Sequence, residues 1–531
     1  MAAKVLGMTM TMTRKTPRTS AARRPAAAAR GAATTAAGSA PAKVAAKTAA
    51  KPPAGGRRYR LDESIKRLSP AERADLGRQL RAEVPRGSHA GFERPAAAPS
   101  PIELLERQSR NRVPELVPIR YGRMLASPFS YFRGAALPMA YDLASTPVTG
   151  LSVQACGDAH CGNFGLFGSA ERRLVFDIND FDETQPGPWE WDVKRLAASL
   201  EISARENGIA RKQRSAIVRA AVARYRLAMR EFAGMTNLQV WYTAADLAEI
   251  ERLLQGKLTK AQQDNLAKEV SKATTRDSHQ VLAKLTTTVD GRLRIVASPP
   301  LITPLHSLLP ADADRDAVHA VLNRAVAGYR RSLPGDRRYL LDQYEYELAD
   351  LARKVVGVGS VGTQCWIMLL RGRDTGDPLF LQMKEAEASV LAEFVGPSGF
   401  ENQGQRVVEG QRLMQAAGDI FLGWHRQRIT LDSRVRDFYI RQLRDWKFSF
   451  DTAAMVPTGL AAFGEVCGWT LARAHARSGD RIAIAAYLGG SDSFDRAIAD
   501  FAAAYADQNE RDYAALDKAA TVGEVLAHRG V

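Results

Sequence analysis

Two short polar loops in the first half of the chain carry side chains that could do chemistry. The first loop places Asp158, His160 and Asn163 between two glycines, a composition that suits a tight turn whose backbone lies close to a ligand. The second loop follows an apolar run typical of a strand and contains Asp180. A carboxylate that orients a hydroxyl, with an amide and a second carboxylate that hold Mg²⁺, is what phosphoryl transfer needs.

The second loop offers three candidate metal ligands, Asp177, Asp180 and Asp182. Their chemistry does not distinguish them, because each is a carboxylate in the same acid-rich turn. A further acid, Asp192, opens a predicted helix twelve residues after Asp180. A capped turn would explain the polar residues of the first loop alone, but chance rarely gives the joint spacing of the two loops and Asp192. We therefore predict that the two loops form one site.

The first loop resembles the G-D-x-H-x-x-N catalytic loop of aminoglycoside phosphotransferase-like and choline kinase-like enzymes, members of the protein-kinase-like superfamily. Cys156 stands where those families usually have a leading His. Their metal-binding Asp follows in an Asp-Phe or Asp-Trp pair, which favours Asp180. The resemblance implies that Asp158 is the catalytic base or hydroxyl-orienting residue and that His160 braces the loop. It also implies that Asn163 and Asp180 bind Mg²⁺.

From about residue 120 onward, the chain also resembles an uncharacterised bacterial family, domain of unknown function 2252. The resemblance rests on the phrases SPFSYFRG, GDAHCGNFG, FDINDFDET, WEWDVKRLA and VGVGSVGT, and the family name implies no activity. Three arginines, Arg120, Arg123 and Arg133, alternate with aromatic residues in this region. A guanidinium near a phosphate site can clamp phosphate oxygens, and the resemblance favours Arg133 for this catalytic role. The alternative is that the arginines pair with acids of the second loop or lie on the surface.

A glycine-rich motif lies much later in the chain. Gly357, Gly359 and Gly362 form G-x-G-x-x-G, and two strand-like apolar runs follow, the second ending in Lys384. In a dinucleotide-binding fold a helix would follow the third glycine. A strand, a glycine turn and two further strands ending in Lys is the order of a protein-kinase N-lobe, where the loop covers the ATP phosphates and the Lys contacts them. We therefore predict that these four residues bind ATP; the alternative for Lys384 is an exposed lysine at a strand end.

A kinase N-lobe also contains a helix whose Glu pairs with that Lys. The segment 401–417 is predicted to be this helix, and Glu409 is the predicted partner of Lys384. Glu387 and Glu393 are close rivals. A later segment, 460–477, resembles the helix that usually comes just before the catalytic loop.

The order of these parts is reversed relative to a conventional kinase, because the catalytic loop precedes the N-lobe. We therefore predict an α+β, two-lobed, protein-kinase-like fold that is circularly permuted, with helices at 315–332 and 339–353. The alternative treats 350–450 as an unrelated α+β domain with a chance glycine motif. The predicted parts are a basic tail (1–58), a helical lead-in and linker (59–119), a large helical lobe with the catalytic loop and metal site (120–349), a small β-rich nucleotide-binding lobe (350–450), and C-terminal helices that pack back on the large lobe (451–531).

Composition limits the classes of function. The net charge is +16, but thirteen Lys and Arg residues precede Asp62, the first acid, so the rest of the chain carries about +3. The tail 1–58 is too poor in large apolar residues to fold. We expect it to be disordered and to bind nucleic acid weakly and in a salt-dependent way; the alternative is an extension of biased composition without function.

No run of about 18 apolar residues occurs, so no membrane span is expected. The four cysteines are scattered, which favours a reducing cytosol. Cys156, His160 and Cys161 could suggest zinc, but no second paired motif supplies the remaining ligands.

The sequence thus predicts a cytoplasmic phosphotransferase that uses ATP and Mg²⁺ and acts on a small-molecule or protein hydroxyl that the sequence does not identify. Three alternatives stay open. The first is a catalytically inactive nucleotide-binding regulator, and the second is a nucleic-acid-associated protein that acts through its tail. The third is a metal-dependent hydrolase built on the acids and the histidine of the two loops. The glycine motif and Lys384 count against the hydrolase, which needs neither.

Overall fold

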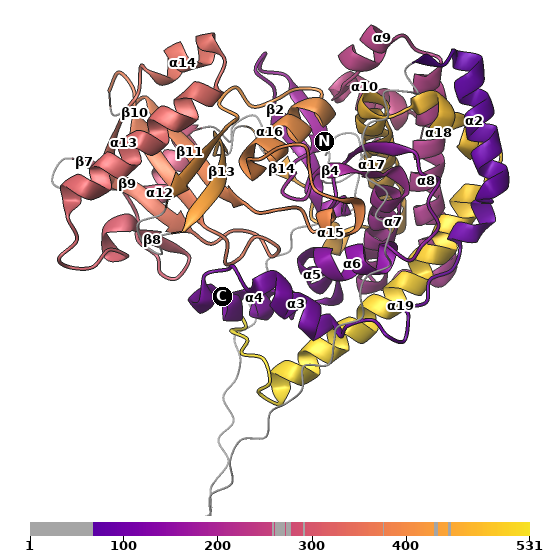
Figure 1. The fold of residues 1–531 in the computed structure, drawn as a ribbon, viewed down its shortest axis with the longest axis horizontal. Helices are drawn as coiled ribbons and strands as arrows, with labels where there is room; N and C mark the ends of the chain where they lie inside the picture. Colours follow the sequence, from indigo (N-terminus) through magenta and orange to yellow (C-terminus); the bar gives the residue numbers. More distant parts are fainter. Residues whose placement is uncertain are drawn as a thin grey trace, which may run out of the picture.

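The computed structural model describes residues 67–531, apart from gaps at 257–259, 261–270, 272–277, 290–291, 375, 429–433, 444–445 and 447. The predicted tail, residues 1–58, lies outside the described residues. The described residues form a mixed α+β fold. Figure 1 shows a helical lobe on the right and a strand-rich lobe on the left. None of the described helices is long and apolar enough to cross a membrane.

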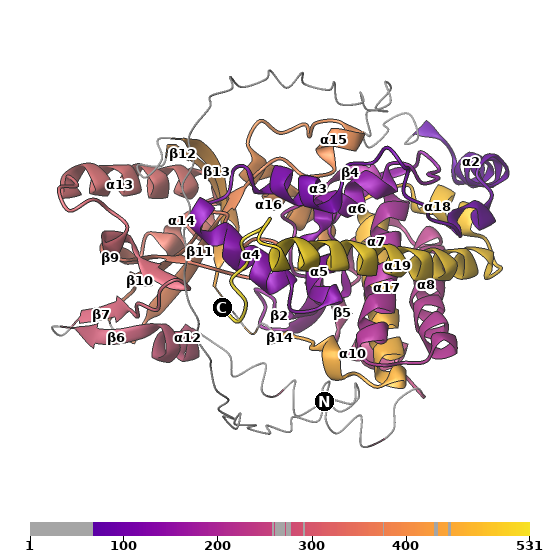
Figure 2. The ribbon, with the colours of Figure 1, turned by 90° about the horizontal axis from the view of Figure 1, so that it is seen from below.

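Four long helices build the core of the helical lobe: α7 (Trp189–Glu206), α8 (Arg211–Ala233), α17 (Pro457–Ser478) and α19 (Ser493–Thr521). They pack against one another around a shared cluster of buried apolar residues, and Figure 2 shows them from a second side. Because α17 is rich in Ala and Gly, its backbone lies close to α8. A Cβ atom added at Gly468 would be 2.2 Å from the carbonyl oxygen of Ala221, so this contact requires glycine.

Shorter helices surround this core. The first of them begins at a capping box formed by Ser69 and Glu72. The shorter helices are α2 (Pro70–Glu83), α3 (Pro101–Ser109), α4 (Val117–Met124), α5 (Pro128–Gly134), α6 (Ala136–Leu143), α9 (Asn237–Tyr242), α10 (Leu247–Leu253) and α18 (Arg481–Leu488).

Short strands of the helical lobe place the two polar loops side by side. The first loop joins β1 (Ser152–Ala155) to β2 (Phe164–Gly168), and the second joins β3 (Leu174–Ile178) to β4 (Gln185–Pro188). β1 pairs with β4, and β2 pairs with β3. These two strand pairs hold the ends of one loop next to the ends of the other. β2 and β3 belong to a sheet of order β14-β2-β3-β5, with β5 (Ala245–Asp246) and β14 (Phe448–Ser449) at its edges.

The strand-rich lobe is built on a six-stranded antiparallel sheet of order β12-β13-β11-β10-β9-β8. Alternate residues of β10 face opposite cores: Trp366 faces α13 and α14, and Ile367 faces α12 and β7. The elements of this lobe are α12 (Ser278–Leu285), β6 (Thr286–Val289), β7 (Arg292–Ile295), β8 (Ile302–Pro304), α13 (Arg315–Ser332), α14 (Gly335–Leu341), β9 (Glu345–Lys354), β10 (Cys365–Arg371), β11 (Pro378–Ala386), β12 (Gly423–Arg428) and β13 (Val435–Gln442).

Two short helices, α15 (Ala392–Val395) and α16 (Gln403–Met414), follow β11. α16 packs against the sheet and also against α17. Arg406 of α16 donates hydrogen bonds to the carbonyl oxygens of Asp182 at 2.8 Å and of Thr184. α16 therefore links the strand-rich lobe to the second polar loop.

The two strands predicted after the glycine turn, the second with Lys384, are confirmed by β10 and β11. The predicted helices at 315–332, 401–417 and 460–477 correspond to α13, α16 and α17. The helix predicted at 339–353 is wrong, because α14 ends at Leu341 and β9 follows. Leu351 and Ala352 face opposite cores in β9, so pairing with β10 overrides the helix propensity of these residues. The boundary predicted at residue 350 falls inside β9.

Candidate active site

The first polar loop is held in place by Asp192. Its carboxylate accepts hydrogen bonds from the backbone amides of Cys156 at 2.6 Å and Gly157 at 2.9 Å, and Nε2 of His475 lies 3.1 Å from Oδ2. Gly157 has φ +82°, and a Cβ atom there would be 2.2 Å from the carbonyl oxygen of Glu183. Asp192 therefore fixes the backbone of the loop against the neighbouring loop, at a position where only glycine fits.

Asp158 and Asn163 lie near the two ends of this loop and line the same cavity. Arg195 donates from Nε to Oδ1 of Asp158 at 2.8 Å, and the Asp158 side chain is 19% exposed. The side-chain amide of Asn163 donates to the carbonyl oxygen of Asp158 at 2.8 Å. This bond engages the amide nitrogen of Asn163, so its side-chain oxygen is the atom available to coordinate a metal ion.

His160 is buried beneath the loop. Burial lowers the pKa of its imidazole to about 3, although the nearby Asp158 opposes the shift. The ring packs edge-on against Phe129, and its Nδ1 has no hydrogen-bond partner among the described residues. A neutral, buried ring of this kind supports the loop and does not exchange protons near neutral pH.

The three acids of the second loop have different surroundings. Asp177 is fully buried and accepts two hydrogen bonds from Arg473, at 2.6 and 2.7 Å, and one from the backbone amide of Ala416. The side chains of Asp180 and Asp182 are 32% and 29% exposed. The geometry therefore removes Asp177 from the candidate metal ligands, because its lone pairs face an internal arginine.

Replacing Asp177 with Asn is expected to lower the free energy of unfolding by about 3–5 kcal/mol, because it leaves the buried charge of Arg473 without a partner. Arg473 has no exposed side-chain surface, and its described hydrogen bonds go to Asp177 alone. Urea denaturation of the purified variant measures this loss. The control is Asp507→Asn, since Asp507 is exposed and pairs with Arg205 at the surface; it should cost below about 1 kcal/mol. Equal, small losses for both variants would contradict the expectation.

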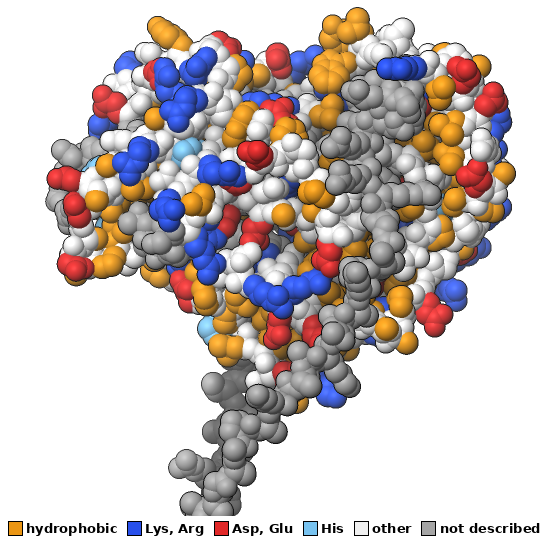
Figure 3. Space-filling view, in the orientation of Figure 1, with side chains coloured by type: hydrophobic (Ala, Val, Ile, Leu, Met, Phe, Trp, Pro, Cys, Tyr) orange, Lys and Arg blue, Asp and Glu red, His pale blue; other side chains and the backbone are white. Residues whose placement is uncertain are grey.

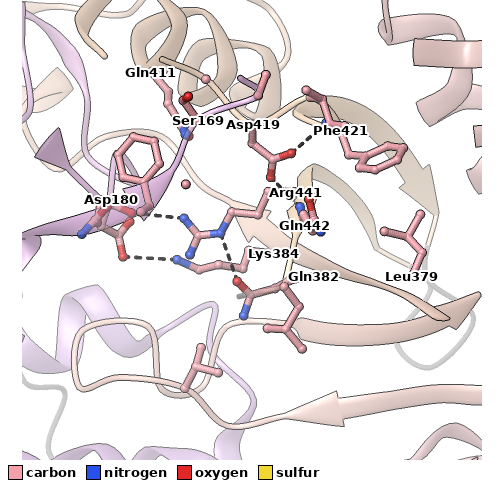
Figure 4. Close-up of a pocket in the computed structure, with 18 of the residues that line it drawn as sticks. Ser169, Asp180, Leu379, Gln382, Lys384, Gln411, Asp419, Phe421, Arg441 and Gln442 are labelled. Atoms are coloured by element: carbon pink, nitrogen blue, oxygen red, sulfur yellow. Dashed lines mark hydrogen bonds and ion pairs between the residues drawn. The ribbon is translucent and has the colours of Figure 1, made fainter. Parts of the chain in front are cut away.

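Lys384 of β11 reaches the second loop from the strand-rich lobe. Its ammonium lies 2.6 Å from Oδ2 of Asp182 and 3.5 Å from Oδ2 of Asp180, and its side chain is 2% exposed. Burial opposes the charge, but the two carboxylates raise the pKa of the ammonium well above its usual value. Lys384 is therefore a buried cation, and Figure 4 shows it pointing at Asp180 across the cavity.

The prediction that Glu409 pairs with Lys384 is wrong. Glu409 pairs with Arg412 of its own helix at 3.3 Å, whereas the ion pairs of Lys384 are with Asp180 and Asp182. α16 contacts the second loop through Arg406, whereas the Glu409 side chain is 36% exposed.

The two rivals of Glu409 do not replace it. Glu393 pairs with Arg107 at 2.8 Å on the surface. Glu387 lines the cavity beside Asp158 but makes no ion pair to a described residue.

The glycine motif forms the loop between β9 and β10. Gly357 has φ +64° and Gly362 has φ +90°, conformations that side chains rarely adopt. A Cβ atom at Gly359 would be 3.2 Å from the carbonyl oxygen of Arg133. The hydroxyl of Ser360 donates to Oδ2 of Asp182 at 3.1 Å. The loop therefore lies against the second polar loop, far away in the sequence.

Two cavities meet at this point. The larger, about 1010 Å³, is lined by residues that include Asp180, Lys384, Gln382, Arg441, Gly357 and Ser360. The smaller, about 120 Å³, is lined by residues that include Asp158, His160, Asn163, Asp180, Arg133 and Gly359. Asp180 borders both cavities. Every site residue predicted from the sequence lines one of these cavities except Glu409 and Gly362, and Gly362 packs against Arg112 instead.

Arg133 is the one of the three predicted arginines that faces the smaller cavity. Its Nε is buried and has no hydrogen-bond partner among the described residues. Arg120 instead donates to the carbonyl oxygen of Gly134 at 2.8 Å, and Arg123 donates to that of Gly357 at 2.7 Å. Arg120 and Arg123 therefore support the backbone around the site, and Arg133 is placed to contact an anionic group.

Sequence reasoning missed Arg195 and Arg441. Arg441 of β13 is a second cation in the larger cavity and is partly buried. It donates to Oε1 of Gln382 at 3.1 Å and to the carbonyl oxygen of Asn179 at 3.1 Å (Figure 4). Tyr439 lies opposite Lys384 in the ladder, so Arg441, two residues on, shares its face. The alternation of side chains along β13 could have indicated that Arg441 shares a face with Lys384. Using this signal requires knowing that β13 pairs with β11.

The Glu183 carboxyl in the wall of the smaller cavity supplies a pH prediction. Burial raises its pKa to about 7, although the backbone amide of Val390 donates to it at 2.7 Å. The folded state therefore keeps a proton that the unfolded chain releases near pH 4.5. Its stabilising contribution is present below that pH and is lost as the pH rises through 7.

Glu183→Gln mimics the protonated acid. The unfolding free energy of the variant minus that of wild type should therefore be about 1–2 kcal/mol larger above pH 7 than at pH 4.5. This range allows for the partial exposure of Glu183. Urea denaturation of both proteins at the two pH values measures the change. A difference between the proteins that does not vary with pH would contradict it.

The residues fit a magnesium site. The side-chain oxygen of Asn163 and the carboxylate of Asp180 line the same cavity, and Mg²⁺ is typically held by one or two protein oxygen ligands together with phosphates and water. Among the described residues, no three His, Cys, Asp or Glu side chains group as a metal site. The zinc alternative therefore has no described ligand cluster to support it.

Comparison with known proteins supports one assignment. Residues 112–519 match the model of a family described as an uncharacterized protein conserved in bacteria, domain of unknown function 2252. Neither a curated protein nor a solved structure matches the chain. The matched segment contains both polar loops, the glycine motif and Lys384. The chain therefore belongs to the bacterial family with the domain of unknown function 2252.

Proposed function

We propose that the protein is an ATP-dependent phosphotransferase that transfers a phosphoryl group to a hydroxyl acceptor. The observation that carries this proposal is the meeting of Lys384 with Asp180, whose side chains are 204 residues apart in the chain and 3.5 Å apart in space. An acid predicted to hold magnesium and a lysine predicted to hold phosphates thus border one cavity. A volume of about 1010 Å³ is large enough for a nucleotide.

In this proposal the two cavities have different occupants. Lys384 and Arg441 bind the nucleotide phosphates in the larger cavity, under the backbone of the glycine loop. Asp158 orients the acceptor hydroxyl in the smaller cavity and takes up its proton. Asn163 and Asp180, at the junction, hold the metal ion. When bound, Mg²⁺ neutralises charge that develops on the transferred phosphoryl group.

We also propose that the fold is a circularly permuted, two-lobed, protein-kinase-like fold. In support, the catalytic loop precedes the glycine loop and Lys384 in the chain, and both border the same site. α17 then returns to the helical lobe, where His475 lies 3.1 Å from Asp192, the acid that holds the catalytic loop. The segment that would precede the catalytic loop in a conventional kinase is therefore next to it in space.

One observation favours a second candidate, a nucleotide-binding regulator without transfer activity. The Asp158 carboxylate is paired with Arg195 at 2.7 Å, so one of its oxygens already accepts hydrogen bonds from the guanidinium. The experiment that decides is incubation of the purified chain with γ-labelled ATP and pools of bacterial metabolites. The phosphotransferase predicts labelled product with wild type and none with Asp158→Ala. Nucleotide binding without label transfer to any pool favours the regulator.

A nucleic-acid role for residues 1–58 is a separate proposal, based on the thirteen basic residues before Asp62. Over the face shown in Figure 3, basic and acidic side chains are intermingled, so that face offers no continuous basic surface. DNA retention by the full chain should therefore fall with salt and disappear when residues 1–58 are deleted. Retention that survives the deletion would contradict this role of the tail.

A further inference from the structure

The Asp182 carboxylate is the meeting point of three separate parts of the strand-rich lobe. It accepts hydrogen bonds from Lys384 of β11 at 2.6 Å, from the hydroxyl of Tyr439 of β13 at 2.6 Å, and from the hydroxyl of Ser360 in the glycine loop at 3.1 Å. Its backbone carbonyl accepts a further bond from Arg406 of α16 at 2.8 Å. Among the described residues, the ion pairs of Lys384 are with Asp180 and Asp182, and the helix residue Glu409 pairs with Arg412 instead.

Asp182 and Asp180 make unequal contacts with Lys384. The ammonium is 2.6 Å from the Asp182 carboxylate and 3.5 Å from that of Asp180. If Asp180 turns to a metal ion, Lys384 keeps its closer partner. The ring of Tyr439 lies 5.3 Å from the ammonium and supports it from another side. An ammonium has three donors, so one remains for a phosphate oxygen after the two carboxylates.

We propose that Asp182 is the positioning residue of the nucleotide site. It holds Lys384 where the phosphates bind, and through Ser360 it holds the glycine loop over the same place. This inference rests on the proposed function. In kinase-like enzymes a helix glutamate pairs with this lysine. Here Asp182, two residues after the proposed metal ligand Asp180, takes that role. The second polar loop then positions both Lys384 and the proposed metal ligand.

The test compares Asp182→Asn with Asp182→Glu, which keeps the charge, and with the control Glu409→Gln. The first measurement is the rate at which acetic anhydride modifies the Lys384 amine, followed by mass spectrometry. Asp182→Asn removes the charged partner that holds the ammonium at 2.6 Å, so this change should speed modification about tenfold. Asp182→Glu should restore most of the protection, and Glu409→Gln should match wild type, because its carboxylate does not contact Lys384.

The second measurement is the affinity for a fluorescent ADP analogue with Mg²⁺. Asp182→Asn should weaken binding about tenfold, since Lys384 and the glycine loop are no longer held, and Tyr439→Phe should change it less in the same direction. Unchanged affinity and unchanged lysine reactivity in Asp182→Asn would overturn the inference. If wild type itself binds no nucleotide, the proposed function fails, and the reactivity of Lys384 still decides whether Asp182 holds it.

Discussion

Replacing Asp158 with Asn is expected to lower kcat for phosphoryl transfer about 1,000-fold and to leave the affinity for Mg-ATP nearly unchanged. Asp158 lines the smaller cavity, away from Lys384 and Arg441, so it contacts the acceptor side of the site. An amide keeps the shape of the side chain, and its oxygen can still accept the hydrogen bond that Arg195 donates at 2.8 Å. The variant therefore removes the charge that is proposed to receive the hydroxyl proton and preserves the loop.

Steady-state kinetics with the acceptor found by label transfer measures this prediction. The control is Asp246→Asn, since the Asp246 carboxylate pairs with Arg173 outside both cavities, and its kcat should equal that of wild type. A variant at Asp158 that keeps full kcat, or that loses only affinity for ATP, would contradict the role assigned to this carboxylate.

The second large effect is expected from Asp180→Asn. This change should weaken Mg²⁺-dependent ATP binding at least about 100-fold, because loss of a metal ligand costs at least as much as loss of a group that only supports one. Asp180 borders both cavities and is 32% exposed, so it can reach an ion between them. Lys384 should stay in place, because Asp182 is its nearer partner at 2.6 Å.

Titration of the variant with ATP at increasing Mg²⁺ concentration measures this loss. The matched control is Asp374→Asn, an exposed acid paired with Arg373 in the turn between β10 and β11, which should show the wild-type Mg²⁺ dependence. An Asp180→Asn protein with that same dependence would show that the ion is held elsewhere.

The sequence was most informative where local pattern decides structure. The apolar runs after the glycines at 357, 359 and 362 predicted two strands, and the fold contains both as β10 and β11. The spacing of Asp192 predicted an acid at the start of a helix, and Asp192 lies in the first turn of α7. The structure adds that its carboxylate binds two amides of the first loop. These features depend on neighbours in the chain, so they can be inferred without tertiary information.

Predictions that required knowing side-chain direction were less successful. Glu409 lies on the predicted helix, but helix position does not reveal which face meets Lys384. Arg195 was grouped with an ordinary amphipathic helix, although it pairs with Asp158 across the lobe. Among Asp177, Asp180 and Asp182, only burial separates the internal ion pair from the exposed acids. The choice of Asp180 came from the family-like Asp-Phe pair and from its twelve-residue spacing to Asp192, not from charge.

The central claim is that two distant parts of the chain hold one magnesium-bound nucleotide. Its most direct test is labelling of the full chain with an acyl phosphate of ATP, which acylates lysines beside bound nucleotide phosphates. The expected result is Mg²⁺-dependent acylation of Lys384 that excess ATP blocks and that Asp180→Asn abolishes. Acylation of other lysines alone, or acylation of Lys384 that neither ATP nor the change at Asp180 affects, would contradict the claim.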